Sequence, residues 1–150
     1  MAIRLSTALR NQLLDTGSFK GIFSASTGFV IDIYTGSQPT TADDAPTGTK
    51  LVTISNNSAG TTLHFDTAAA SGSIGKLTSE TWSGTGLTTG TAGWFRIRML
   101  TDAGGVSTTV PRYDGACATS GAQLNLGSLT ITTSAPVTIS AATFTVPSTV

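Results

Sequence analysis

The chain has 150 residues, which is enough for one domain with a buried core. It carries only eight Lys and Arg, eight Asp and Glu, one His and one Cys, and its formal net charge is zero. So few titratable groups argue against an enzyme, and the lack of a basic block argues against nucleic-acid binding. We therefore expect a structural or interaction protein with no cofactor and no metal.

One short helix is predicted, near the N-terminus. Ser6 is a suitable N-cap, and Leu5, Leu9 and Leu13 recur at a spacing of four, which places them on one face. A helix of about ten residues is marginal in isolation, so this face must pack against the protein's own strands or against a neighbouring subunit. We expect residues 1–17 to form an N-terminal helix or arm and residues 18–150 to form a single domain.

From Phe29 onward the hydrophobic period is two, which is typical of strands and places Phe29, Ile31 and Ile33 on one face. Residues 36–48 contain two prolines and paired aspartates, and they predict a long exposed loop. Residues 102–105 predict a hairpin turn between two of the strands. The predicted strands cover residues 29–34, 50–55, 61–66, 79–83, 94–100 and 106–110, with shorter ones around 115–118 and 123–126.

The C-terminal third holds the longest alternation of apolar residues. Its apolar positions are first odd and then even: Leu129, Ile131, Val137, Ile139 and Ala141 are followed by Ala142, Phe144 and Val146. A β-bulge within residues 140–142 would keep both sets on one buried face. The whole pattern predicts an all-β fold, an antiparallel β-sandwich of the jelly-roll kind, with no transmembrane segment and no signal peptide.

Searches for catalytic or metal-binding patterns return only isolated residues. His64 falls on the polar face of its expected strand and has no second His for a zinc site, and the single Cys117 reads as a buried apolar residue. Asp43 and Asp44 read better as a solvated turn than as a weak cation site. No Gly-x-Ser-x-Gly sequence is present, and residues 72–76 depart from a phosphate-binding loop.

The polar face of the strand at 94–100 carries the strongest interface signal. Trp94, Arg96 and Arg98 lie on one side of it, and Asp32 and Tyr34 would lie beside them if the two strands pair. Trp, Tyr and Arg are enriched at interface hot spots, which favours a partner-binding surface. Equally, each Arg could stack on Trp or pair with an acid within the chain.

Several stretches, taken in order, resemble a family of small virion proteins of tailed bacteriophages. They are residues 4–11, 33–39 with Ala42 and Asp43, 91–96, 107–115 and 119–126. Residues 56–76 show no such likeness. The resemblance implies a non-enzymatic structural protein of the virion, with a head-decoration or cement role.

On this reading, the protein assembles in the host cytoplasm and binds the major capsid protein on the capsid exterior. It would form a homo-oligomer, for which a trimer is one hypothesis, and would contact neither nucleic acid nor membrane. The candidate partner interface comprises Arg4, Leu5, Leu9, Arg10, Leu13, Trp94, Arg96 and Arg98. The leucines would bury in the partner, while Arg4 and Arg10 would meet acidic groups at the rim.

Three alternatives to a capsid cement remain at this point. The first is a tail, neck or baseplate component. The second is a carbohydrate- or receptor-binding module in which Trp82, Trp94 or Tyr34 forms a stacking platform for sugar rings. The third, which has the least support, is a hydrolase built from Asp and Thr side chains.

Overall fold

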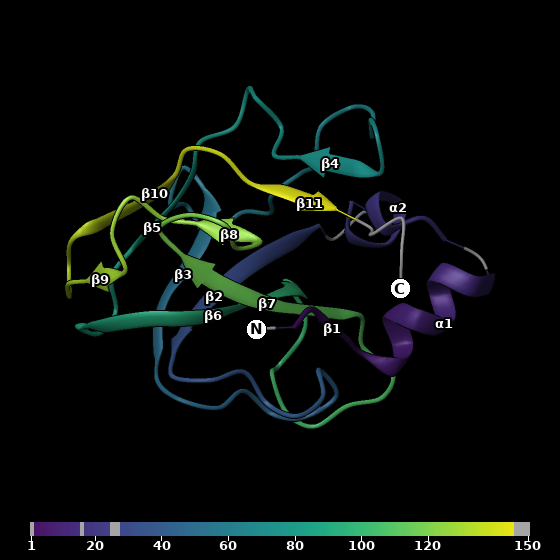
Figure 1. The fold of residues 1–150 in the computed structure, drawn as a ribbon, viewed down its shortest axis with the longest axis horizontal. Coiled ribbons are helices and arrows are strands. Elements are labelled where there is room, and N and C mark those ends of the chain that lie inside the picture. The colour runs from purple at the N-terminus through teal and green to yellow at the C-terminus, as the bar shows by residue number, and fades with distance from the viewer. Residues whose placement is uncertain (1, 16, 25–27, 146–150) are drawn as a thin grey trace.

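The computed structural model describes residues 2–15, 17–24 and 28–145. Strands, nearly all of them antiparallel, are the main regular structure of these residues, and two short helices lie together at one end (Figure 1). The elements are β1 (Arg4–Leu5), α1 (Thr7–Asp15), α2 (Phe19–Phe23), β2 (Phe29–Thr35), β3 (Lys50–Asn56), β4 (Ser73–Gly75), β5 (Trp82–Thr85), β6 (Gly90–Met99), β7 (Arg112–Ala118), β8 (Leu124–Asn125), β9 (Thr130–Ile131), β10 (Pro136–Ile139) and β11 (Thr143–Thr145).

The larger sheet has the strand order β1-β7-β6-β2-β3-β5-β10, and neighbours along this path are antiparallel. β8 adds to β7 in parallel, and β9 pairs with the start of β6. β4 and β11 form a separate antiparallel pair that lies over the larger sheet in Figure 1. The predicted all-β antiparallel sandwich with a short N-terminal helix is therefore confirmed.

The hydrophobic core lies between the larger sheet and the smaller pair. Phe29, Ile31 and Ile33 of β2 face it, as the alternation predicts, and their register partners on β6 include Ile97 and Phe95. An aromatic cluster from α2, residues 61–66, β5 and β11 fills the space between the layers, with Phe29 and Phe65 stacked at 4.6 Å between ring centroids. Residues far apart in sequence thus share one core.

A bulge in β6 lets the central strands follow the curve of the sheet. The register between β2 and β6 shifts so that Tyr34 pairs with Trp94 while Thr35 pairs with Ala92, which leaves Gly93 as the extra residue. A Cβ at Gly93 would collide with the backbone carbonyl of Gly36. Only glycine allows the two backbones to approach so closely.

The helical content is partly as predicted. α1 begins after Ser6, whose hydroxyl accepts the Leu9 N–H at 3.2 Å, and this confirms the expected N-cap. The expectation of a single helix is wrong, because α2 follows immediately. Its N-cap is Ser18, whose side chain accepts the N–H of Gly21. Five residues that include a glycine carry too little periodicity to mark a helix from sequence.

Three predicted strands are misplaced. Residues 61–66 make only isolated bridges, in which Leu63 meets Phe29 and Phe65 meets Lys76. The strand expected at 79–83 begins at Trp82, and the described residues 106–110 contain no strand. Instead, β7 starts directly after Pro111 and pairs with β6. The hairpin thus has a longer loop than expected, because Pro111 cannot donate a ladder hydrogen bond.

The change of apolar phase near residue 141 has a different cause from the expected bulge. β10 ends at Ile139 in the larger sheet, and β11 begins at Thr143 in the smaller one. Ile139 and Phe144 are both buried, each in its own strand, so the phase shift marks the crossing between two sheets. Val146 lies outside the described residues.

The face of the central strands opposite the core is also buried. Trp94 and Arg96 are fully enclosed, and Arg96 donates two hydrogen bonds of 2.7 Å to the carboxylate of Asp114. Arg96 also lies over the Trp94 ring at 5.5 Å, and Trp94 stacks on Tyr34. The intrachain alternative for this face is therefore the one that the structure shows.

We predict that Asp114→Ala lowers the free energy of unfolding by about 3–5 kcal/mol, because Arg96 would remain buried without a partner. Urea denaturation followed by tryptophan fluorescence measures the loss. Asp15→Ala, at an exposed position of α1, is the control and should change stability by less than about 0.5 kcal/mol. An equal, small effect of both substitutions would contradict the prediction.

Candidate functional site

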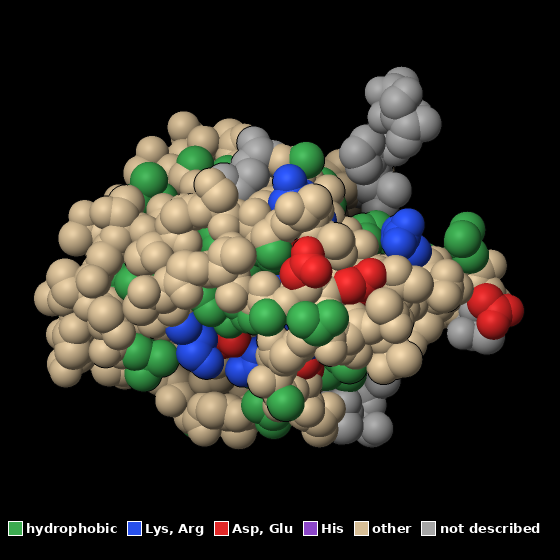
Figure 2. Space-filling view, turned by 90° about the horizontal axis from the view of Figure 1, so that it is seen from below, with side chains coloured by type: hydrophobic (Ala, Val, Ile, Leu, Met, Phe, Trp, Pro, Cys, Tyr) green, Lys and Arg blue, Asp and Glu red, His purple; other side chains and the backbone are tan. Residues whose placement is uncertain are grey.

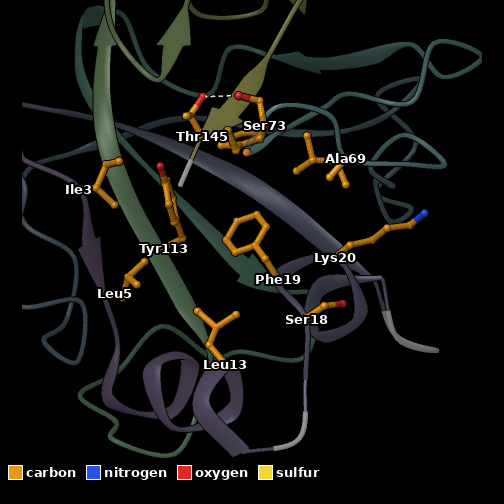
Figure 3. Close-up of a pocket in the computed structure, with 13 residues that line it drawn as sticks. Ile3, Leu5, Leu13, Ser18, Phe19, Lys20, Ala69, Ser73, Tyr113 and Thr145 are labelled. Atoms are coloured by element: carbon orange, nitrogen blue, oxygen red, sulfur yellow. Dashed lines mark hydrogen bonds between the residues drawn. The ribbon is translucent and has the colours of Figure 1, made fainter. Parts of the chain in front are cut away.

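An apolar groove of about 600 Å³ lies beside the N-terminal arm, which we define as residues 2–15. Figure 3 shows the groove between the arm, α2 and the smaller sheet. Its apolar walls come from the arm, the start of α2, β7 and the strand pair of β4 and β11. The lining residues are Ile3, Leu5, Leu13, Ser18, Phe19, Lys20, Ala69, Gly72, Ser73, Ile74, Tyr113, Phe144 and Thr145.

The groove forms where the two layers of the sandwich separate. Leu5 of β1 pairs with Tyr113 of β7, and both side chains lie on the core side of the sheet edge. Phe144 of β11 approaches from the other layer, with its ring centroid 5.8 Å from that of Tyr113. Phe19 contacts both rings and forms one end. The groove is thus an opening into the aromatic core.

The polar groups of the groove lie mainly at its margin. Ser73 and Thr145 hydrogen-bond through their hydroxyls at 2.8 Å, and the Lys20 ammonium donates to the carbonyl of Thr67. The Tyr113 hydroxyl is buried and has no hydrogen-bond partner among the described residues. Burial raises the pKa of Tyr113 above its ordinary value, so the phenol stays protonated at neutral pH. Among the described residues that line the groove, Lys20 alone is charged, and its ammonium is hydrogen-bonded to Thr67.

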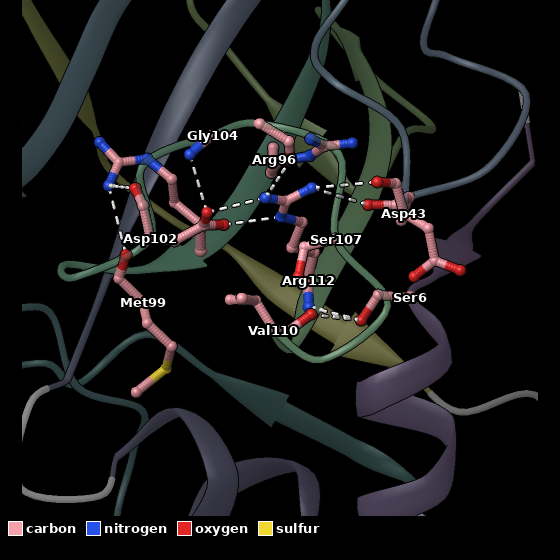
Figure 4. Close-up of polar contacts among 12 residues, drawn as sticks. Ser6, Asp43, Arg96, Met99, Asp102, Gly104, Ser107, Val110 and Arg112 are labelled. Carbon is pink, nitrogen blue, oxygen red and sulfur yellow. Dashed lines mark hydrogen bonds and ion pairs between the residues drawn. The ribbon is translucent and has the colours of Figure 1, made fainter.

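Polar contacts with distant loops hold the arm in place. The Ser6 hydroxyl donates to the carbonyl of Val110 at 2.9 Å and accepts the N–H of Arg112 at 2.9 Å (Figure 4). Asp43 accepts both the N–H and the hydroxyl of Thr7, at 2.8 and 2.6 Å. A carboxylate at the first turn of α1 also complements the helix dipole. Asp43 thus lies in a turn, as expected, and from there its partly exposed carboxylate caps α1, which the sequence did not indicate.

Arg112 connects the loops behind the arm. Its guanidinium donates to both oxygens of Asp102, at 2.6 and 2.7 Å, and to the carbonyl of Gly105 at 2.7 Å. It also points at the carbonyls of residues 42–44. Burial would raise the pKa of Asp102, but hydrogen bonds from Arg112 and from the N–H of Gly104 outweigh it and hold that pKa below its ordinary value.

The residues that sequence analysis placed in a partner interface occupy different surroundings. Leu9 is completely buried in the protein's own core, so it cannot enter a partner. Leu5 and Leu13 are half-buried in the groove wall. Arg4 donates to the carbonyl of Gln38, and Arg10, which is exposed, donates to the hydroxyl of Thr7.

The second half of the predicted interface is internal. Trp94 and Arg96 are enclosed beneath the loop of residues 36–48, whose Asp44 carbonyl accepts a hydrogen bond from Arg96. Arg98 pairs with Asp32 at 2.7 Å, and its side chain is 14% exposed. The structure thus brings Leu5 and Leu13 together at one groove and separates them from Trp94, Arg96 and Arg98.

His64 and Cys117 have no arrangement for catalysis in the described residues. His64 contacts the carboxylate of Glu80 at 2.6 Å, and Trp82 donates to the same carboxylate. Burial opposes ionisation of Glu80, but these hydrogen bonds dominate and lower its pKa. Burial raises the pKa of Cys117 to about 12, which makes its thiol unreactive. The described residues hold no cluster of three or more His, Cys, Asp or Glu suited to a metal ion.

Sequence reasoning missed Phe19, Tyr113 and Phe144 as parts of one site. Phe19 belongs to the unpredicted helix, and Tyr113 follows a proline in a strand whose start was misplaced. The alternation places Phe144 on the apolar face, but it does not show that Phe144 belongs to a second sheet. The separations of these residues along the chain give no signal that could have joined them.

Comparison with family models, with curated proteins and with solved structures finds no match to this chain. Within the described residues, no helix has the length and apolar character needed to cross a membrane.

We predict that acid weakens the fold partly through Asp102. Because the folded-state pKa of Asp102 lies below its ordinary value of 3.8, its stabilising effect is complete above that value and is lost as the pH falls through the folded-state pKa. Asp102→Asn should therefore lower stability at neutral pH and flatten the acid limb. Urea midpoints measured from neutral pH down to about pH 3 test this, and parallel curves for both proteins would contradict it.

Proposed function

We propose that the chain is a non-enzymatic structural protein of a tailed-bacteriophage virion, which binds the outside of the capsid shell through the groove and the N-terminal arm. The observation that carries the proposal is the groove itself. It exposes an apolar surface that continues into the core and is framed by a firmly held arm. The resemblance of the sequence to small phage virion proteins supplies the identity of the partner, the major capsid protein.

The use of charge supports a binding role over a catalytic one. The buried arginines hold carboxylates in fixed pairs, and Asp43 caps a helix. Groups held in this way stabilise loops and are not free to exchange protons with a substrate. The hydrolase alternative gains nothing from the arrangement of the described acidic residues: Asp15 is exposed on α1, and the others are held in separate structural contacts.

Docking at the groove would be driven by burial of apolar surface, at about 25 cal/mol per Å². Because the arm is already held by Ser6 and Asp43, binding would not have to order it, and that lowers the entropic cost of association. A shell carries many identical sites, so neighbouring contacts would reinforce one another even when each is weak.

The structure does not support a sugar-stacking platform formed by Trp82, Trp94 or Tyr34. Trp82 and Trp94 are completely buried, and Tyr34 is 6% exposed and stacks on Trp94. These rings cannot stack on a sugar in this fold. A tail, neck or baseplate position uses the same kind of surface as a capsid site and remains the second candidate within the virion.

The copy number of the protein per virion tests its location. Quantitative mass spectrometry against the major capsid protein should give a simple ratio with hundreds of copies if the protein decorates the shell. A few to a few dozen copies would assign it to the tail, neck or baseplate. Absence from purified virions would overturn the proposal.

We predict that Leu13→Glu weakens binding to capsid shells by about tenfold or more, because it places a charge in the apolar groove wall. Leu14→Glu is the matched control, since Leu14 is the next residue on α1, is 88% exposed and does not line the groove. Co-sedimentation of each purified variant with shells that lack the protein measures the effect. Equal binding of both variants, with intact folds by circular dichroism, would exclude the groove as the docking site.

A further inference from the structure

The end of the molecule opposite the groove is built from sequence without charge. Residues 81–95 and 115–142 contain no Asp, Glu, Lys, Arg or His. They supply β5, β8, β9, β10 and the first half of β6. The left end of Figure 2, where these elements lie, shows no red or blue side chain among the described residues. This end is therefore a neutral surface rich in Thr, Ser and Gly.

β10 forms one edge of the larger sheet at this end. It pairs with β5 on one side, and no described strand pairs with its other side. The sides toward which the N–H and C=O groups of β10 point can be worked out from the pairing of β5 with β3. The N–H of Asn57 donates to the carbonyl of Thr81, and Ser83 pairs with Ser55, so Thr81 and Ser83 turn their peptide groups toward β3.

Trp82 and Gly84 alternate with those residues and therefore turn their peptide groups toward β10. Their register partners there are Ile139 and Val137. Thr138 lies between these two partners, so its N–H and C=O point away from the sheet. Its side chain is exposed. Within the described part of the chain, Thr138 thus presents an unpaired hydrogen-bond donor and an unpaired acceptor at the edge.

Natural sheet edges are usually guarded by charged residues, by proline or by a covering segment. β10 begins with Pro136, which removes one donor, but the strand carries no charge. A second copy of the same chain suits such an edge, since two identical neutral surfaces bring no like charges together. The zero net charge of the chain also removes long-range repulsion between copies.

We propose that two copies of the chain pair through their β10 strands, antiparallel, about a twofold axis at Thr138. Each Thr138 N–H donates to the Thr138 carbonyl of the second copy, and each Pro136 carbonyl faces the Ser140 N–H of the second copy. The two larger sheets then become one continuous sheet. This pairing is isologous and self-complementary. It does not depend on the proposed capsid function.

Sedimentation velocity of the purified full-length chain tests the proposal, over about a hundredfold range of protein concentration. The wild-type mass should rise reversibly to that of a dimer. Thr138→Lys and Thr138→Glu, each alone, place like charges directly opposite one another across the axis and should weaken dimerisation about tenfold or more. An equimolar mixture of the two variants should restore it, because Lys then faces Glu.

Thr108→Lys, at an exposed position of the loop between β6 and β7, is the control and should dimerise like the wild type. Circular dichroism of each variant confirms its fold. A wild-type chain that stays monomeric throughout would overturn the proposal. So would an oligomer whose mass the Thr138 variants leave unchanged, or two weakened variants whose mixture fails to recover.

Discussion

The structure depends on buried arginine–aspartate pairs on the face of the larger sheet opposite the core. Arg96 with Asp114 and Arg112 with Asp102 are each enclosed, and each uses two hydrogen bonds to the carboxylate. A buried charge without its partner is costly, so each pair requires the loops around it to stay closed. The carbonyls of residues 42–44 and of Gly105 complete these sites. The loop of residues 36–48 and the loop between β6 and β7 are thereby held against the sheet.

The position of the N-terminal arm follows from the same constraint. Arg112 donates its backbone N–H to Ser6, and the loop that Arg112 holds supplies Asp43, which caps α1. The arm therefore has one defined position, with Leu9 in the core and Leu5 and Leu13 along the groove. An arm without these contacts would gain little from its own helix propensity, because nine residues are too few for a stable isolated helix.

The parts of the fold that sequence could predict are those governed by local periodicity. Alternation located β2, β3 and β6 and placed Phe29, Ile31 and Ile33 on one face, which the structure buries in the core, and the cap and spacing of α1 were sufficient for that helix. Alternation shows which residues share a face but not what covers that face. For this reason Trp94 and Arg96 could be read equally well as a surface or as an interior.

The candidate site was largely beyond sequence prediction, because it is formed by long-range packing. Leu5 and Leu13 were identified as candidate interface residues, but their groove also needs Phe19, Tyr113 and Phe144, which come from three other elements. The change of apolar phase near residue 141 was visible, yet a bulge and a crossing between sheets produce the same pattern. Only the pairing of strands distinguishes the two.

In Figure 1 the edge strand β10 lies toward the left, whereas α1 and α2, which supply Leu13 and Phe19 to the groove, lie at the right. Occupation of one end leaves the other accessible, and the two ends differ in chemistry: one is an apolar hollow and the other a line of peptide groups. With the groove on a shell and β10 on a second copy, as proposed above, the chain would act as a connector. A pair of copies joined through β10 would then link two separately anchored grooves, and a load on one anchor would be shared with the other.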